Sequence, residues 1–126
     1  CDTMIEAGKK TIDKAKNLNQ AKKTLRFLSG KKHHIYSSIF VSKNNKKEWG
    51  CTTRSTVFIK KLSNNEINSY LKKTGKAVIQ SVGCYHSETT GPLIFSKLNG
   101  DFYNIMGFPV LRFLKYIREK HPKLLL

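Results

Sequence analysis

The run from Gly83 to Pro109 constrains the fold more than any other part of the sequence. It contains four glycines, two prolines and an Asn-Gly pair, which interrupt short apolar segments of β type. Because glycine and proline favour backbone conformations that end regular elements, the chain must change direction several times around the acidic residue Glu88. Loop-borne functional sites on a rigid scaffold have this pattern.

The same run also has an explanation that needs no function. Asn99-Gly100 is typical of a two-residue hairpin turn, whose arms would be residues 94–98 and 102–106. Gly107-Phe108-Pro109 would then end the second arm and start a helix, with proline at its first position. We therefore predict a hairpin followed by a helix.

Three segments have the spacing of amphipathic helices, and each lies between recognisable start and stop signals. They run from Leu18 to Ser29-Gly30 with Asn17 as N-cap, from the capping box Ser63-Asn64-Asn65-Glu66 to Thr74-Gly75, and from Pro109 to Pro122 with Val110, Phe113, Leu114 and Ile117 on one face.

Strand-type segments alternate with these helices. We predict strands at residues 1–5 and 77–79, and an antiparallel hairpin of residues 35–41 and 51–60 around the Asn44-Asn45 turn. The order predicts an α/β fold with a mixed twisted sheet and flanking helices. No repeat or linker divides the chain, so we expect residues 1–126 to form a single domain.

The charge of the chain is strongly positive. Lysines and arginines outnumber acidic residues by 24 to 8, for a net charge of +16, which first suggests a polyanion such as nucleic acid as partner. Only four of the cations are arginine, the residue favoured for reading bases and phosphates, and the lysines occur in pairs along the whole chain. We expect a solvated basic surface that attracts phosphorylated substrates, and a basic nucleic-acid-binding or interaction domain is the alternative.

The cysteines give no sign of a disulfide framework or a zinc knuckle. Cys1, Cys51 and Cys84 are an odd number without a close pair, so we expect reduced thiols in a cytoplasmic protein. No apolar run is long enough to span a membrane, and we expect no membrane partner.

Histidines and aromatic residues have plain structural explanations. The four histidines are too scattered for a metal site, and we expect His33 at a strand edge, with contact to the site as the alternative. Most aromatic residues alternate with polar ones, which predicts core residues rather than a base-stacking platform. These aromatic residues are Tyr36, Phe40, Phe58, Tyr70, Phe95, Phe102 and Phe113.

Two acids and one lysine are the candidates for chemistry. Asp2 is expected at the end of an apolar strand, and Glu88 lies in the glycine-bounded loop. If they converge, their carboxylates can hold a divalent cation such as Mg²⁺ or Mn²⁺ and activate a water molecule. Lys14 could then balance phosphate charge. The alternative is that Asp2 and Glu88 are turn and cap residues.

Several motifs occur in a fixed order along essentially the whole chain. They are Asp2-Thr3 after a strand, Asp13-Lys14, Leu28-Ser29-Gly30 with His33, residues 62–70 of the form Leu-Ser-x-x-Glu-Ile-x-x-Tyr, Val82-Gly83-Cys84-Tyr85 with Glu88, and residues 99–109. In this order they resemble the Maf family, the septum-formation-inhibitor-like proteins that act as nucleoside triphosphate pyrophosphatases.

The resemblance implies an activity and roles for individual residues. Members hydrolyse nucleoside triphosphates, including modified ones, between the α and β phosphates, and depend on a divalent cation. By position, Asp2 is similar to the family's general base and Lys14 to its phosphate-contacting lysine, while Thr3 and Glu88 match positions that tune substrate choice. The family also suggests a homodimer.

Two departures from the family pattern affect these expectations. Position 88 is Glu where many members have Gln, a variant that resembles the branch acting on 7-methyl-GTP. Members also have a Ser-x-Ser-Pro-Arg-Arg loop that contacts the triphosphate, whereas this sequence starts at the strand with Asp2. We therefore expect the C-terminal two-thirds of a Maf/ITPase-like fold, a piece that lacks the N-terminal portion.

Overall fold

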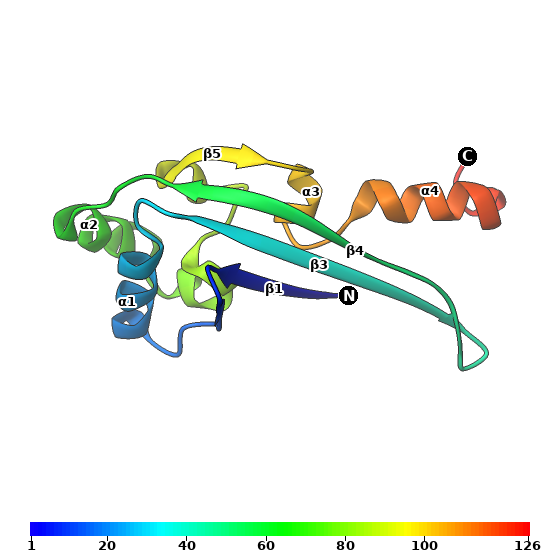
Figure 1. Cartoon of the computed structure of the whole chain (residues 1–126), viewed down its shortest axis with the longest axis horizontal. Helices are drawn as coiled ribbons and strands as arrows, with labels where there is room; N and C mark the ends of the chain where they lie inside the picture. Colours follow the sequence, from blue (N-terminus) through cyan, green and yellow to red (C-terminus); the bar gives the residue numbers. More distant parts are fainter.

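The computed structural model describes residues 1–126 and contains one five-stranded sheet in the order β2-β1-β3-β4-β5. Helices flank this sheet (Figure 1). In chain order the elements are β1 (Asp2–Ala7), β2 (Lys10–Ile12), α1 (Leu18–Leu28), β3 (Lys32–Lys43), β4 (Lys46–Ile59), α2 (Asn64–Thr74), the 3₁₀ segments Gly75–Gln80, Val82–Cys84 and Gly91–Leu93, β5 (Phe95–Asn99), α3 (Phe102–Ile105), α4 (Val110–Lys120) and the 3₁₀ segment Pro122–Leu124.

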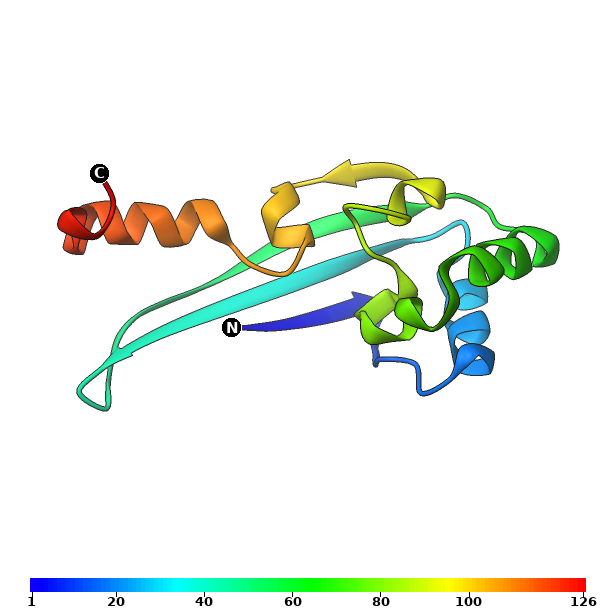
Figure 2. The same cartoon turned by 180° about the vertical axis from the view of Figure 1, so that it is seen from behind.

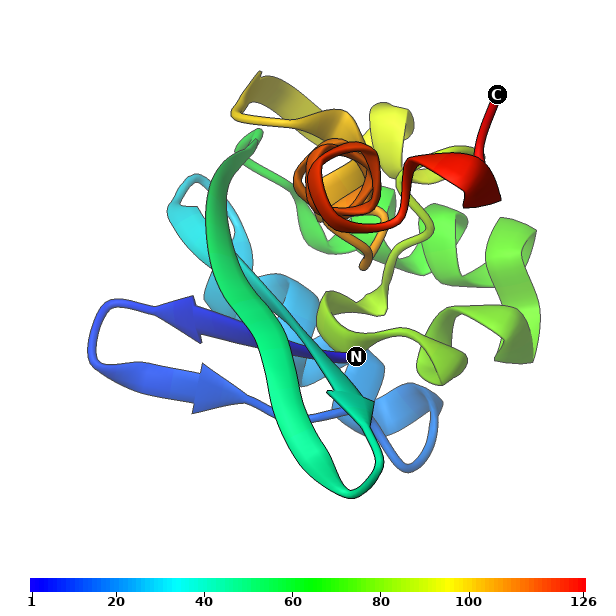
Figure 3. The ribbon, with the colours of Figure 1, turned by 90° about the vertical axis from the view of Figure 1, so that its right-hand side faces the viewer.

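The molecule is elongated because β3 and β4 extend well beyond the other strands. Helices α1 and α2 lie at one end, while the tip of the β3–β4 hairpin and α4 lie at the other (Figures 1 and 2). Figure 3 looks along the molecule from this second end and shows the twisted hairpin beside α4. We call residues 39–51 together with α4 the arm, and the remainder the body.

Local sequence signals account for the main elements. The Asn17 side chain accepts the Gln20 N–H at 2.9 Å and so caps α1. The turn of the long hairpin has positive φ at both central residues, 52° at Asn44 and 61° at Asn45, as a tight turn between twisted strands requires. The predicted first helix and the predicted long hairpin are therefore confirmed.

The second helix is confirmed in the same way. The Ser63 hydroxyl accepts the Glu66 N–H at 3.1 Å, and the Glu66 carboxylate accepts the Ser63 N–H at 3.2 Å. This reciprocal pair satisfies two backbone donors that the first turn of α2 leaves free.

A core of 19 buried residues fills the space between the sheet and the helices of the body. Helix α1 contributes Ala21, Leu25 and Leu28, which have no exposed surface. Burial of this apolar face, rather than helix propensity, supplies most of the stability of so short a helix.

The sheet differs from the prediction in its pairing. All neighbouring strands are antiparallel, so the α/β class is confirmed but the expected mixed sheet is not. The sequence analysis also missed β2, which pairs with β1 through Ile5 and Ile12. This strand has only three residues, too few to show an alternating pattern.

The predicted hairpin at Asn99-Gly100 is wrong. Strand β5 pairs with β4 instead, and residues 102–105 form α3, because the Asp101 side chain accepts the Tyr103 N–H at 2.9 Å and caps a helix. A single helical turn also buries Asn104, whose amide nitrogen donates to Thr53 O at 3.3 Å and Ser55 Oγ at 2.9 Å. The helical turn thus satisfies the amide of a buried side chain.

Smaller expectations also need correction. Residues 77–79 lie in a 3₁₀ segment rather than a strand, and Pro109 is the residue before α4 rather than its first residue. Helix α4 is confirmed, although Val110, Phe113 and Leu114 of its predicted face are only half-buried. Of the seven aromatic residues predicted as core, only Tyr70 is buried, and Phe40 and Phe102 are exposed by 59% and 42%.

Candidate functional site

A cavity of about 280 Å³ opens between β1, the central loop and the end of α3. Its walls come from segments far apart in the chain: Thr3 and Ile5 of β1, Lys14 after β2, Ile35 of β3, residues 80–82 and 85–88, and residues 105–107. Figure 2 shows the loop region after α2 lying beside β1. The antiparallel sheet therefore brings together residues that the sequence keeps apart.

Thr3 joins the strand side of the cavity to the segment that leads into α4. Its hydroxyl donates to Gly107 O at 3.2 Å and lies 3.4 Å from Ser37 Oγ. Ser37 Oγ in turn donates to Asn104 O at 3.0 Å. With φ of +112°, Gly107 adopts a conformation that other residues avoid, so this wall depends on a glycine.

The loop with Glu88 is held by the neighbouring imidazole and by backbone hydrogen bonds. His86 Nε2 donates to Ala77 O at 3.0 Å, and its Nδ1 lies 3.2 Å from Ser81 Oγ. The Gly91 N–H donates to His86 O at 2.8 Å and closes the turn. Glu88 itself is exposed and lines the cavity, so its carboxylate is available to an entering ligand.

A buried tyrosine, Tyr85, lines the cavity, and the buried imidazole of His33 lies behind it. Nε2 of His33 lies 2.6 Å from the Tyr85 hydroxyl, and the His33 side chain is almost fully buried. Burial, with a smaller contribution from the charge of His34, lowers the pKa of His33 to about 4, and burial also raises the pKa of Tyr85. His33 is therefore neutral at physiological pH. It lies at the start of β3, as predicted, although β3 is an interior strand, and it contacts the site through the cavity-lining Tyr85.

Three of the four candidate residues from the sequence line this one cavity: Thr3, Lys14 and Glu88. Asp2 does not line it. The Asp2 carboxylate accepts the N–H of Thr3 at 2.9 Å, and the side chain is exposed. Because successive residues of a strand point to opposite faces, Asp2 lies on the other face of β1 from Thr3.

The arrangement now allows comparison with known proteins. A family model described as "Maf-like protein" matches residues 1–120. The chain belongs to the Maf family. The resemblance noted from its motifs is thus confirmed, as is the α/β class with flanking helices.

Curated relatives carry names that describe an activity. A protein from Hyphomonas neptunium named "Nucleoside triphosphate pyrophosphatase" is 32% identical over 117 residues, which cover 93% of this chain and 59% of the relative. One from Rhizobium meliloti named "7-methyl-GTP pyrophosphatase" is 30% identical over 118 residues, covering 94% of this chain and 59% of the relative. The Maf chain described here therefore spans about 59% of the length of these relatives.

The donor set of the cavity fits only one kind of cation site. No three His, Cys, Asp or Glu side chains of the Maf chain cluster as a metal cage would require, and Glu88 is the one carboxylate in the cavity wall. Mg²⁺ typically binds through one or two carboxylates together with substrate phosphates. The cavity thus fits a cation that is shared with a phosphate chain.

Some residues of the Maf site escaped the sequence analysis. Ser81, Tyr85, His86 and Gly107 all line the cavity, and His86 had been considered only as a metal ligand. Gly107 gave a usable signal because a glycine between apolar residues marks an unusual backbone conformation. Ser81 gave none, since its place in the cavity wall depends on the fold of the 3₁₀ segments.

No helix of the Maf chain has the length and apolarity needed to cross a membrane.

Proposed function

We propose that the cavity binds a nucleoside triphosphate, and that the protein hydrolyses it between the α and β phosphates. Water adds across the phosphoanhydride bond, and the products are a nucleoside monophosphate and pyrophosphate. The convergence of Thr3, Lys14 and Glu88 in one cavity carries this proposal. Membership of the Maf family and relatives named as pyrophosphatases support it.

Three residues of the cavity have a role in this reaction. The Lys14 ammonium attracts the negative phosphate chain and stabilises charge on its oxygens. The Thr3 hydroxyl and the Glu88 carboxylate contact the substrate and influence which nucleotide is accepted. Modified nucleotides such as 7-methyl-GTP are included, because one relative is named for that substrate.

A divalent cation, Mg²⁺ or Mn²⁺, completes the proposal. Glu88 and Asp2 would hold it together with the phosphates, and the ion would offset charge on the phosphoryl oxygens and polarise the attacking water. An ionised Asp2 would accept a proton from this water as general base. To do so Asp2 must give up the hydrogen bond to the Thr3 N–H, and the start of β1 must shift so that its side chain reaches the cavity face of the strand.

The first experiment measures pyrophosphate release from canonical and modified nucleoside triphosphates with Mg²⁺ or Mn²⁺. We expect turnover that depends on the cation and differs among the bases. If none of the nucleotides is hydrolysed with either cation, the proposed function is wrong.

The second experiment compares the two carboxylates. Because general-base catalysis contributes about 10²–10⁴ in rate, Asp2→Asn should lower kcat by a factor in this range. Glu88→Gln should instead change KM and the order of preferred nucleotides. If Asp2→Asn is fully active while Glu88→Gln loses kcat, then Glu88 is the base and Asp2 is not.

A second candidate function is supported by the distribution of charge. Among the 24 lysines and arginines, only Lys60 forms an ion pair, with Glu66 at 2.5 Å. The remaining positive charge is not neutralised within the protein, as in domains that bind nucleic acid. Filter binding of single-stranded DNA and RNA at two salt concentrations tests this candidate, which requires a steep loss of affinity with salt and no hydrolysis.

A further inference from the structure

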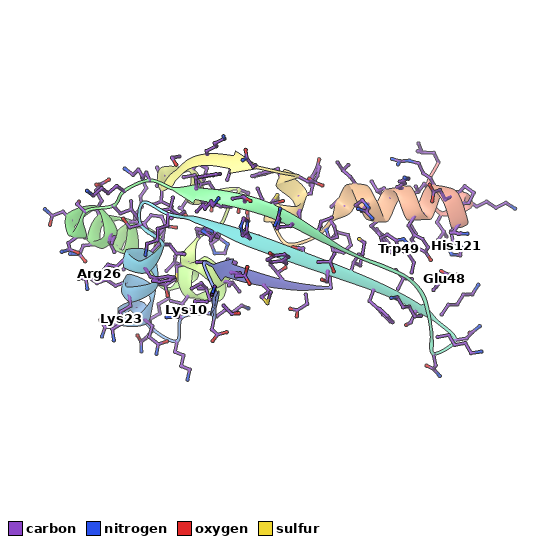
Figure 4. All side chains as sticks on the ribbon, viewed as in Figure 1. Lys10, Lys23, Arg26, Glu48, Trp49 and His121 are labelled. Atoms are coloured by element: carbon purple, nitrogen blue, oxygen red, sulfur yellow. The ribbon has the colours of Figure 1, made fainter.

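A second hollow lies between α1 and the segment that connects it to β2. It has a volume of about 250 Å³, and its walls are residues 10–15 and the face of α1 with residues 20, 23, 24 and 27. Figure 4 shows Lys10 and Lys23 at the α1 end of the molecule. We call this hollow the basic groove.

Positive charge in the basic groove is concentrated and unpaired. Its lining includes Lys10, Lys14 and Lys23, and the one carboxylate is that of Asp13. None of these lysines forms an ion pair with an acidic side chain. Because like charges repel at short range, a bound anion would lower the electrostatic energy of the groove.

Phe27 positions one lysine of the groove lining, Lys10, and also contacts Lys31 outside the groove. The Lys10 ammonium lies 5.0 Å from the centroid of the Phe27 ring, and the Lys31 ammonium lies 4.4 Å from it. The ring packs against the hydrophobic core and is only half-buried, so its position is fixed while its edge remains at the groove. A lysine held over an aromatic ring has less rotamer freedom to lose when it binds an anion.

The basic groove adjoins the candidate site through one shared residue. Lys14 lines both the groove and the cavity with Thr3 and Glu88. The groove is lined mainly by polar residues, with three lysines and few apolar side chains to contact a base. It therefore suits a short chain of phosphate groups better than a nucleoside.

We propose that the basic groove is an oligophosphate-binding subsite, separate from the cavity and continuous with it at Lys14. Its ligand is a chain of phosphate groups, either free pyrophosphate or the terminal phosphates of a nucleotide with a long phosphate chain. Binding to the groove stands on the geometry alone, whereas the identification of these two sources rests on the proposed function.

The chain offers a matched control for the test. Lys9 and Lys22 are the sequence neighbours of Lys10 and Lys23, and neither lines the groove. The double variants K10Q/K23Q and K9Q/K22Q remove the same charge. Because Lys10 and Lys23 are exposed, the groove variant should keep its fold, which circular dichroism verifies.

Isothermal titration with inorganic tripolyphosphate, in EDTA and at low salt, measures binding without hydrolysis. We expect K10Q/K23Q to weaken binding roughly fivefold or more, and K9Q/K22Q to weaken it less than about twofold. Equal weakening in the two variants would mean a diffuse charge effect and would overturn the proposal. Absence of binding by the unsubstituted chain would also overturn it.

Three further ligands distinguish the two sources. If the groove binds free pyrophosphate, K10Q/K23Q weakens the binding of inorganic pyrophosphate. If it binds a phosphate tail, the variant weakens the binding of adenosine tetraphosphate more than that of adenosine triphosphate. Unchanged affinity for all three ligands contradicts the subsite.

The titrations test the subsite and the hydrolysis assay tests the pyrophosphatase, so either proposal can be refuted without the other. Groove-dependent binding by a chain that hydrolyses no nucleotide would refute the pyrophosphatase and leave the subsite standing. Hydrolysis by a chain whose phosphate binding is equal in the two double variants would refute the subsite and leave the pyrophosphatase standing.

Discussion

The body and the arm of this protein are held together by different interactions. The body is built on a cluster of 19 buried, mostly aliphatic residues, and no residue of the arm belongs to that cluster. The arm depends on aromatic contacts instead: the rings of Trp49 and Tyr116 stack with centroids 4.6 Å apart, and Phe108 meets Phe113 edge to face at 5.6 Å.

Polar contacts complete the attachment of α4. The Glu48 carboxylate accepts a hydrogen bond from the Tyr116 hydroxyl and lies 3.0 Å from Nε2 of His121. Figure 4 shows Glu48, Trp49 and His121 together between α4 and the hairpin. The arm thus has its own small cluster of aromatic and polar side chains, apart from the core of the body. Both the cavity and the basic groove belong to the body.

The largest expected effect is in the core of the body. Leu25→Ala removes a side chain with no exposed surface, and such changes cost about 2–5 kcal/mol of unfolding free energy. Leu111→Ala, on an exposed position of α4, should cost less than about 0.5 kcal/mol. Denaturant unfolding of both variants measures the difference, and equal losses would contradict the division into body and arm.

The next largest expected effect is a dependence of the unfolding free energy on pH, which arises from a residue of the body. The pKa of His33 is about 4 in the folded state and near 6.5 when the chain is unfolded, so protons bind the unfolded state preferentially between these values. Stability should therefore fall as the pH decreases from about 6.5 to about 4, by roughly 3 kcal/mol in total.

Unfolding curves at several pH values test this expectation. His33→Leu should abolish the slope in that pH range, whereas His34→Leu should keep it. A slope that persists in His33→Leu would show that another group is responsible.

A smaller effect is expected from the aromatic cluster of the arm. Trp49→Ala removes the stack with Tyr116, and an aromatic pair contributes about 0.5–1.5 kcal/mol beyond the area it buries. Amide hydrogen exchange should become faster in α4 and remain unchanged in α1 and α2. Phe40→Ala, an exposed aromatic residue of the same hairpin, is the control, and loss of protection in α1 would show that the arm is part of one cooperative unit.

The smallest effect should come from the polar end of the arm. Glu48→Gln weakens a partly exposed contact with His121, and such pairs contribute about 0–1 kcal/mol. In this variant, amide hydrogen exchange should be faster only in the last turn of α4. Exchange that accelerates throughout the helix would mean that Glu48, rather than the aromatic rings, attaches the arm.

Local signals account for the parts of the fold that the sequence could predict. Caps and turns are local, so Asn17, the capping box at Ser63 and the turn at Asn44-Asn45 identified their elements correctly. The error at Asn99-Gly100 came from a non-local cause, because the burial of Asn104 against β4 decides between helix and strand.

For the candidate site, the sequence supplied residues but not their arrangement. The residue pattern selected Lys14 and Glu88, the family resemblance added Thr3, and only the fold brings all three into one cavity. Strand alternation was already readable in the sequence and separates the neighbours Asp2 and Thr3 onto opposite faces. Asp2 as general base therefore stays a prediction that depends on a shift of the first residues of β1.

The central claim is that the cavity shared by Thr3, Lys14 and Glu88 hydrolyses nucleoside triphosphates. The most direct measurement is the rate of pyrophosphate release by Lys14→Gln, with Lys16→Gln as control because Lys16 does not line the cavity. Loss of one group that stabilises the transition state should lower the rate by roughly 10²–10³ in Lys14→Gln and leave Lys16→Gln unchanged. Equal rates in the two variants would contradict the claim.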